Sequence, residues 1–281
     1  AGNGVNFEEC YNWIKAADNS RPVQYEQMKD TRFSDIFCPM YLSPAQCEKY
    51  LTSAPSKPLI QCEYAHGRGN GMGNFKEYWE LVRKYPLFQG GFIWDFADQA
   101  IRKVVFDDPG TDFIWTFGGE LPDDNHVDIC GNCEGIVAAD RSLHSQAYEV
   151  AYQYRPILTY SDPESAAFGR FTIFNDNFFI NLDKYMLEWE LVHDGKVIKS
   201  GELYNLDVEP RRSGSVDLGI NAFELEDNGD IYLNVRYLLK QDDGLLEAGH
   251  EVAHDQMLIL ESVPQFVFKG GKTFVEAVGR D

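Results

Sequence analysis

Residues 1–95 alternate between helix patterns and short apolar strand patterns, and this alternation constrains the fold more than any other feature. Apolar residues recur at helical spacing from Phe7 to Ala17, behind an Asn6–Glu9 spacing typical of a capping box. The apolar run at 57–64 then predicts a buried strand. Elements that alternate in this way predict an α/β fold with a parallel sheet.

The rest of this region repeats the pattern. Further strands are predicted at 21–26, 35–41 and 89–95, and a short helix is predicted after Pro44. A second Asn–Glu spacing, Asn74 to Glu77, predicts the start of a helix that Pro86 ends. About four strand–helix units are therefore expected, and eight would complete a TIM barrel.

Polar and aromatic residues gather where the predicted strands end. They are Tyr25, Glu26, Tyr41, Glu63, Tyr64, Trp94 and Asp95. Barrels of this kind place their active sites at the carboxyl ends of the strands. We therefore expect a site here, with Glu63 as the first candidate because a carboxylate beside Tyr64 and His66 suits a glycosidase nucleophile. A structural salt bridge is the alternative for Glu63. Buried packing is the alternative for Tyr25 and Trp94. For His66 the alternative is a purely structural role.

From about residue 157 the pattern changes to short alternating segments. They lie at 169–174, 186–192, 196–200, 213–218, 230–239 and 256–261. His193-Asp-Gly-Lys196 has the composition of a tight hairpin turn. Even spacing of short strands predicts an antiparallel β-sandwich. We expect domains at 1–155 and 156–262, followed at 263–281 by a linker or the start of a truncated domain.

Charge limits the partners. The chain has 25 basic and 45 acidic residues and a net charge of −20. A negative surface repels phosphate backbones and anionic lipid heads, so we expect a neutral substrate, no nucleic acid and no membrane. The sequence leaves the compartment open between cytoplasm and periplasm. Because the chain starts without Met or a signal sequence, we expect it to be an internal part of a longer protein.

The six cysteines predict a chain without disulfides, since most lie in apolar runs. Cys130 and Cys133 have a zinc-like spacing, but no second Cys/His pair stands nearby, so no metal is assigned to them. The glycine-rich segment 67–73 lacks the Gly-Lys-Ser/Thr ending of a phosphate-binding loop.

Several strings together resemble bacterial β-galactosidases of glycoside hydrolase family 2. These strings are Cys62-Glu-Tyr-Ala-His66, Gly90-Gly-Phe-Ile-Trp-Asp95, Arg21-Pro-Val-Gln-Tyr-Glu26, Cys38-Pro-Met-Tyr41, Phe117-Gly-Gly and Gly135-x-Val-x-Ala-Asp-Arg141. The resemblance extends from Ala1 to about residue 262. It implies the C-terminal half of a (β/α)8 TIM barrel followed by an immunoglobulin-like antiparallel β-sandwich.

The resemblance also implies residue roles. Glu63 matches the nucleophile that forms a covalent galactosyl-enzyme, and Tyr25 matches the tyrosine that contacts it. His66 matches a galactose-hydroxyl ligand, and Trp94 matches the floor of the galactose site. The family's acid/base glutamate would stand just before Ala1, together with most ligands of the family's Mg²⁺. The isolated chain is thus expected to be inactive, or nearly so, toward ordinary galactosides.

Two departures from the family pattern bear on specificity. Gly67-Arg68 stands where Ala-Met usually follows the histidine, and Glu134 stands where many members have an Asn near galactose O6 and a Na⁺ ion. Arg68 is expected to alter the preference for the sugar or the aglycone. Glu134 is kept as a candidate substrate-binding residue.

Other interpretations remain open from the sequence. The chain is also compatible with a non-catalytic carbohydrate-binding module or the complementing part of a split enzyme. A different specificity within the family, such as β-glucuronidase, is disfavoured by the Cys62–His66 string. A half barrel exposes strand edges and an apolar face, so we expect a homo-oligomer or association through that face.

Overall fold

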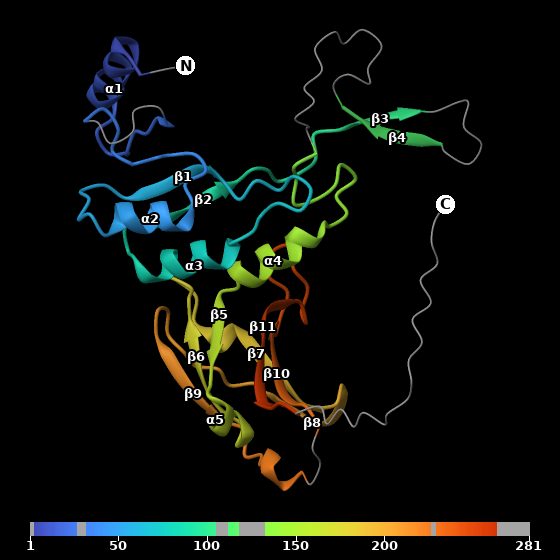
Figure 1. Cartoon of the computed structure of the whole chain (residues 1–281). Coiled ribbons are helices and arrows are strands. Elements are labelled where there is room, and N and C mark those ends of the chain that lie inside the picture. Colours follow the sequence, from blue (N-terminus) through green and yellow to red (C-terminus); the bar gives the residue numbers. More distant parts are fainter. Residues whose placement is uncertain (1–2, 27–31, 105–111, 118–132, 226–228, 263–281) are drawn as a thin grey trace, which may run out of the picture. The chain divides into compact units, whose positions relative to one another are not determined.

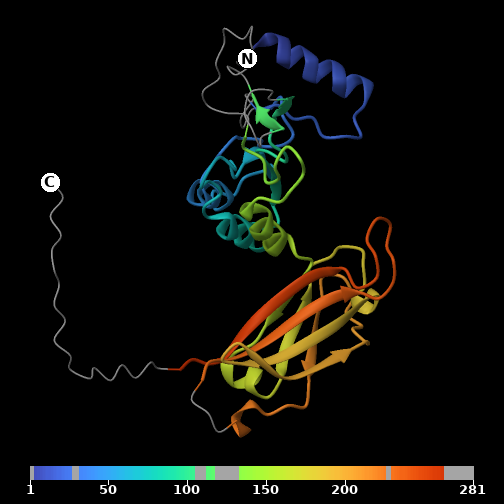
Figure 2. The ribbon, with the colours of Figure 1, turned by 90° about the vertical axis from the view of Figure 1, so that its right-hand side faces the viewer.

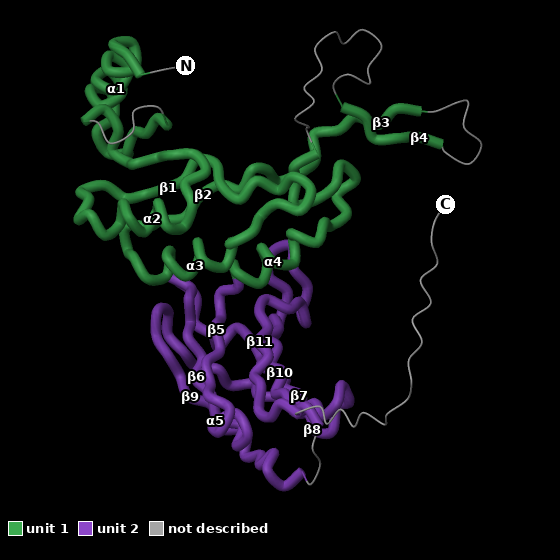
Figure 3. The backbone as a smooth tube through the Cα atoms, in the orientation of Figure 1, with its two compact units in different colours: residues 1–154 green, residues 155–281 purple. Residues whose placement is uncertain are grey.

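The chain divides into two compact units, Ala1–Tyr154 and Arg155–Asp281, shown in Figure 3. The computed structural model describes residues 3–26, 32–104, 112–117, 133–225 and 229–262. The segment predicted as a linker, 263–281, lies outside the described residues. Among the described residues, no helix is both long enough and apolar enough to cross a membrane.

The first unit mixes helices with short strands (Figure 1). Its elements are α1 (Val5–Ala17), α2 (Pro44–Leu51), β1 (Leu59–Tyr64), α3 (Phe75–Lys84), β2 (Phe88–Ile93), β3 (Ile101–Val104), β4 (Phe113–Thr116) and α4 (Ser145–Tyr154). Strands β1 and β2 pair in parallel, as the alternation of helix and strand predicts.

The strand predicted at 35–41 is present only as isolated parallel bridges, from Phe37 to Leu59 and from Met40 to Glu63. Pro39 lies between them and has no amide hydrogen to donate, although its carbonyl accepts a bond from the Cys62 amide. No strand forms over the described residues of 21–26, because the Val23 amide donates to the Asp35 carboxylate instead of to a neighbouring strand.

The parallel arrangement continues beyond the regular strands. Residues 37–41 lie along one edge of β1, and β2 lies along the other. After β2, residues 95–98 pair with 134–137 through backbone bonds such as Asp95 N to Glu134 O, 3.0 Å. Segments that are far apart in sequence thereby end at the same side of the first unit.

Helices α2, α3 and α4 share one core with these strands. Its buried residues are Cys47, Leu51, Leu59, Tyr64, Phe75, Tyr78, Leu81, Phe88 and Val150. The Tyr64 hydroxyl lies 2.9 Å from that of Tyr154 and accepts a bond from the Trp79 indole. A polar network inside the aromatic core thus fixes the strand that carries Glu63.

The helix starts differ from those that the sequence predicts. Gly4, not Asn6, is the N-cap of α1, and Asn6 lies inside the helix. Asn74 does precede α3, but it adopts a left-handed conformation and its side chain makes no cap bond. The complete capping box belongs to Ser43 and Gln46 of α2, where Pro44 occupies the first turn.

The second unit contains two antiparallel sheets, whose strands are seen from two sides in Figures 1 and 2. One sheet has the order β11-β10-β7-β8 and the other β5-β6-β9. The strands are β5 (Ile157–Tyr160), β6 (Arg170–Asn175), β7 (Tyr185–His193), β8 (Lys196–Leu203), β9 (Ser213–Asp217), β10 (Ile231–Leu239) and β11 (Glu251–Leu260), with helix α5 (Pro163–Ala167) and the 3-10 turns η2 (Leu182–Lys184) and η3 (Ala222–Glu224).

Both sheets contribute to one hydrophobic core. Alternate residues of β7 and β10 are buried, as the alternating pattern predicts. The β7–β8 hairpin turns at Asp194 and Gly195, which both have positive φ, as the sequence of that turn predicts. At the core edge, Asp255 accepts bonds from Arg155 Nη2 (3.0 Å) and the Thr159 amide (2.9 Å).

Candidate active site

The candidate site lies where β1 and β2 end. Glu63 is the penultimate residue of β1, and His66 follows that strand. Trp94 follows β2, and its amide donates to the Tyr64 carbonyl (3.0 Å), while the Gly67 amide donates back to the Trp94 carbonyl (2.9 Å). Backbone bonds therefore hold the two strand ends side by side.

Glu63 is held by a phenol from the neighbouring segment. The Tyr41 hydroxyl donates to Glu63 Oε2 at 2.6 Å, and the Tyr41 amide donates to the Glu63 carbonyl at 2.9 Å. Burial raises the pKa of Tyr41, and the bond to Glu63 raises it further. The phenol therefore stays protonated at neutral pH and donates its hydrogen to the carboxylate.

A second carboxylate, that of Glu134, lies at the same strand ends and contacts Trp94 and His66. Glu134 is only 9% exposed. Its Oε2 accepts a bond from the Trp94 indole (2.8 Å) and lies 3.3 Å from His66 Nε2. The rings of His66 and Tyr41 lie 5.9 Å apart between centroids. The two carboxylates thus belong to one continuous group of side chains.

The backbone of Gly135, next to Glu134, is held by side chains of two other segments. The Gly135 amide donates to Asp98 Oδ1 (2.9 Å), and the Gly135 carbonyl lies 2.9 Å from His144 Nδ1. A Cβ at Gly135 would lie 2.3 Å from the Asp98 amide nitrogen, so only glycine fits here. This close approach holds the segment that carries Glu134.

The structure brings together four of the five predicted site residues, namely Glu63, His66, Trp94 and Glu134. Tyr25 stacks on Phe7 with ring centroids 4.1 Å apart, and its predicted contact with the nucleophile stays a prediction. Among the described residues, Tyr41 donates a phenol hydrogen bond to Glu63. Sequence reasoning placed it at a strand end without assigning it a role.

Comparison with known proteins places the chain in a family. The family model described as "Glycosyl hydrolases family 2, TIM barrel domain" matches residues 1–159. The chain belongs to glycosyl hydrolase family 2. A second model, "Beta-galactosidase, domain 4", matches residues 171–259. The resemblance read from the sequence strings is thereby confirmed at the level of the family.

Curated relatives in this family carry the name beta-galactosidase. The chain is 36% identical to that of Priestia megaterium over 263 residues, covering 91% of this chain and 24% of the relative. It is 35% identical to a Vibrio vulnificus relative and 33% identical to one from Pseudoalteromonas haloplanktis, covering 92% and 93% of this chain and 26% of each relative. The chain spans about a quarter of the length of these relatives.

The metals that the family resemblance implies stay a prediction, because the resemblance puts most of their ligands outside this chain. Within the described ranges, no group of three His, Cys, Asp or Glu side chains could hold a metal ion. At Glu134, Oε2 already faces an indole N–H and an imidazole nitrogen. We therefore derive no step through Mg²⁺ or Na⁺. Cys133 is an exposed thiol, and Cys130 lies outside the described residues, so their zinc-like spacing has no structural test.

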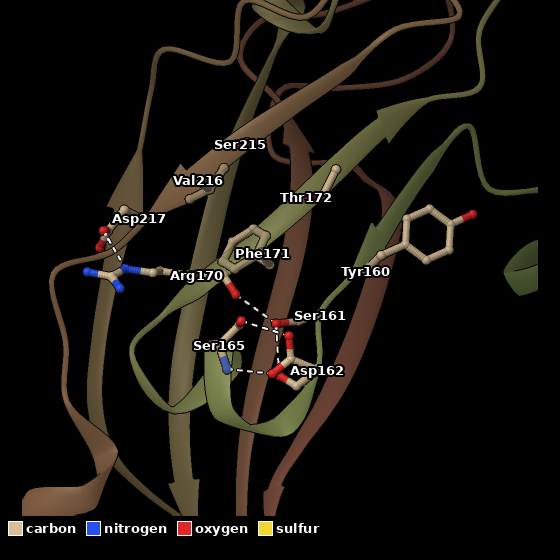
Figure 4. Close-up of a pocket in the computed structure, with 10 residues that line it drawn as sticks. All are labelled: Tyr160, Ser161, Asp162, Ser165, Arg170, Phe171, Thr172, Ser215, Val216 and Asp217. Atoms are coloured by element: carbon tan, nitrogen blue, oxygen red, sulfur yellow. Dashed lines mark hydrogen bonds and ion pairs between the residues drawn. The ribbon is translucent and has the colours of Figure 1, made fainter.

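A pocket of about 390 Å³ lies on the second unit (Figure 4). Its polar side chains already serve the fold. Asp162 caps α5 by accepting from the Ser165 amide (2.8 Å), and Arg170 Nε donates to Asp217 across β6 and β9 (2.9 Å). The Ser165 hydroxyl also donates to Asp162 (2.7 Å), within the same helix cap, so the first unit remains the candidate active site.

Proposed function

We propose that this chain provides the nucleophile and the sugar-binding floor of a retaining β-galactosidase. The observation that carries the proposal is the pair of contacts at the strand ends. Glu63 accepts from Tyr41 at 2.6 Å, beside the His66–Glu134–Trp94 group. A carboxylate held by a phenol donor, in a group that includes an indole and an imidazole, suits attack on a sugar bound against an aromatic ring.

In the proposed reaction, a Glu63 oxygen attacks the anomeric carbon of a terminal β-D-galactoside. The bond from that carbon to the aglycone oxygen breaks, and a galactosyl ester forms on Glu63. Water then attacks the same carbon, releases galactose and regenerates the carboxylate. Tyr41 holds Oε2 in place, which leaves the other Glu63 oxygen to act as the nucleophile.

Protonation of the leaving group needs a second carboxyl group, about 5–5.5 Å from the first in retaining enzymes. The family resemblance puts this acid just before Ala1. We therefore propose that the 281-residue chain hydrolyses unactivated galactosides such as lactose very slowly. A substrate with a good leaving group avoids this requirement in the first step.

The proposed function also implies a fold for each unit. We propose that the first unit is the C-terminal half of a TIM barrel, supported by the parallel pairing of β1 with β2 and the matching family domain. The second unit is then an immunoglobulin-like sandwich, supported by its two antiparallel sheets around one core. The domain limits of 1–155 and 156–262 go with this proposal.

Covalent trapping tests the proposed nucleophile. The chain is incubated with 2,4-dinitrophenyl 2-deoxy-2-fluoro-β-D-galactoside, and intact mass and peptide mapping locate the adduct. We expect one fluorogalactosyl group on Glu63, none in Glu63→Gln, and normal labelling in Glu164→Gln, which removes an exposed carboxylate of α5. An adduct on another residue, or no adduct with a folded chain, would overturn the proposal.

A further inference from the structure

The backbone of Tyr41 is held in an unfavourable conformation. Its φ is 53°, in the left-handed region that a bulky side chain rarely adopts. Such a conformation persists only where the surroundings impose it. The Tyr41 amide donates to the Glu63 carbonyl (2.9 Å), which holds this residue beside β1. Directly after Tyr41 the chain enters the cap of α2, so a second restraint has to act at Leu42.

The side chain of Gln61 supplies that restraint. Gln61 is 0% exposed, and its Oε1 accepts a hydrogen bond from the Leu42 amide at 2.7 Å. It lies on β1, two residues before Glu63. The strand that carries Glu63 therefore binds the backbone on both sides of the Tyr41 side chain, through the Glu63 carbonyl and through Gln61.

Tyr78 of α3 binds the same residue. Its hydroxyl donates to the Leu42 carbonyl at 2.7 Å, and the residue is only 8% exposed. Burial raises the pKa of Tyr78 to about 12, so the phenol remains a donor at neutral pH. Both backbone polar groups of Leu42 are thus bonded to buried side chains, one from β1 and one from α3.

The polar end of Gln61 is not explained by stability alone. Among the described residues, its buried Nε2 has no hydrogen-bond partner. A buried amide with one end unpaired costs free energy that an apolar side chain of similar length would avoid. The gain that offsets this cost is the single bond from Oε1 to the Leu42 amide.

We infer that Gln61 and Tyr78 are positioning residues, which hold Tyr41 in the conformation that directs its hydroxyl to the Glu63 carboxylate. The inference rests on the proposed function, because it assigns both residues to the proposed nucleophile. They act through the backbone of Leu42 and then through the Tyr41 phenol, which donates to Glu63 Oε2 at 2.6 Å. The alternative is a role in stability alone.

The two roles differ in how substitutions combine. Gln61→Met keeps the length of the side chain and removes the acceptor for the Leu42 amide. A residue that works through Tyr41 loses its effect once the Tyr41 hydroxyl is absent, whereas a purely structural residue keeps it. The test is a double-mutant cycle of Gln61→Met and Tyr41→Phe in the 281-residue chain. The measured quantity is the rate at which 2,4-dinitrophenyl 2-deoxy-2-fluoro-β-D-galactoside labels Glu63.

We expect Gln61→Met to slow labelling at saturating reagent by about tenfold, the effect of leaving a buried amide without its acceptor, and to change the half-saturating concentration little. In the Tyr41→Phe background, the same substitution should slow labelling by less than about twofold. Gln61→Glu keeps an oxygen acceptor and should label within about threefold of the wild type. Tyr78→Phe should slow labelling with the same dependence on Tyr41.

Val150→Ala is the control for lost stability. Val150 is 7% exposed in the same core, and its apolar side chain takes no part in the bonds to Leu42. This variant should be less stable but label at the wild-type rate while it is folded. Equal slowing by Gln61→Met with and without the Tyr41 hydroxyl would overturn the inference, as would a wild-type rate in Gln61→Met. If Gln61→Met does not fold, the cycle of Tyr78→Phe with Tyr41→Phe decides in the same way.

Failure of the two proposals would look different. If the wild-type chain leaves Glu63 unlabelled, the proposed function fails and this inference falls with it. If the wild type is labelled but the effect of Gln61→Met does not depend on Tyr41, only the positioning role fails.

Discussion

At the scale of single residues, the hydrogen bond from Tyr41 to Glu63 is the contact on which the proposed nucleophile role of Glu63 rests. Glu63 makes this bond with a phenol whose pKa is raised, so the donor keeps its hydrogen at neutral pH. A salt bridge, the alternative for Glu63, would need a basic partner. None pairs with Glu63 among the ion pairs of the described residues.

We predict that Tyr41→Phe slows labelling of Glu63 by the fluorogalactoside by roughly 10- to 100-fold, the effect of losing a hydrogen bond to a charged group. Labelling rates from intact mass measure the effect. Tyr160→Phe, which removes an exposed phenol of the second unit, is the matched control and should label at the wild-type rate. Equal rates for both variants would show that Tyr41 does not position the nucleophile.

At the scale of elements, the helix caps show how far sequence patterns reach. The Asn6–Glu9 and Asn74–Glu77 spacings match a capping box, but neither asparagine side chain makes a cap bond. A four-residue spacing says nothing of backbone conformation, and a cap needs an extended residue such as Ser43, with φ −66° and ψ 160°. The spacing of residues therefore predicts that a helix is present better than it predicts the residue at which the helix begins.

We predict that Ser43→Ala destabilises α2 by about 1 kcal/mol, while Asn6→Ala changes stability little. Ser43 gives up a bond to the Gln46 amide, whereas Asn6 lies exposed within α1. Hydrogen exchange of the α2 and α1 amides measures each effect locally. The reverse order, with Asn6→Ala the more damaging, would contradict the assigned caps.

Asp35 predicts a pH dependence for the packing of α1. Burial would raise the pKa of Asp35, but hydrogen bonds from Lys15, Tyr11 and the Val23 amide outweigh it and lower the pKa to about 2. A lowered pKa stabilises the folded state above the unfolded value, near 4, and this stabilisation is lost as pH falls toward 2. Asp35→Asn should therefore be less stable than wild type at pH 6.

The free energies of unfolding of the wild type and Asp35→Asn should become equal as pH falls to about 2. Protonation of Asp35 then removes from the wild type the charge that the variant lacks. Urea unfolding monitored by circular dichroism across this range measures the difference. A difference that stays constant from pH 6 to pH 2 would mean that the Asp35 charge does not anchor α1.

Sequence patterns also predicted only part of the candidate site. Glu63, His66 and Trp94 could be predicted because strand ends of a parallel sheet gather at one side. The contacts of His66 and Trp94 with Glu134 could not be predicted, because residue 134 follows a long irregular stretch that carries no periodic pattern. Tyr41 was missed for a related reason, since Pro39 interrupts the strand that would have marked its direction.

At the scale of the whole molecule, the first unit has exposed apolar side chains beside a sheet of only two regular strands. Phe92, Phe96 and Met40 are 63%, 66% and 40% exposed. Short open sheets with apolar surface tend to pair with other chains. The two β-sheets of the second unit, in contrast, bury a shared core.

We predict that the 281-residue chain self-associates at micromolar concentration and that Phe92→Asp shifts it toward monomer. Size-exclusion chromatography with light scattering measures the mass. Phe179→Asp, at a 94% exposed position of the second unit, serves as the control and should leave the association unchanged. A wild-type chain that stays monomeric at all concentrations would contradict the prediction.

The approach of Gly67 to the Glu134 carbonyl limits which residues position 67 can accept. Both residues depart from the pattern of the family that the sequence resembles, in which Ala follows the histidine and Asn is common at the later position. A methyl group at 67 would collide with the backbone at 134, whichever side chain residue 134 carries. Gly67→Ala is therefore accepted only if the segment around residue 134 moves, and a substitution at 134 alone would not relieve the collision.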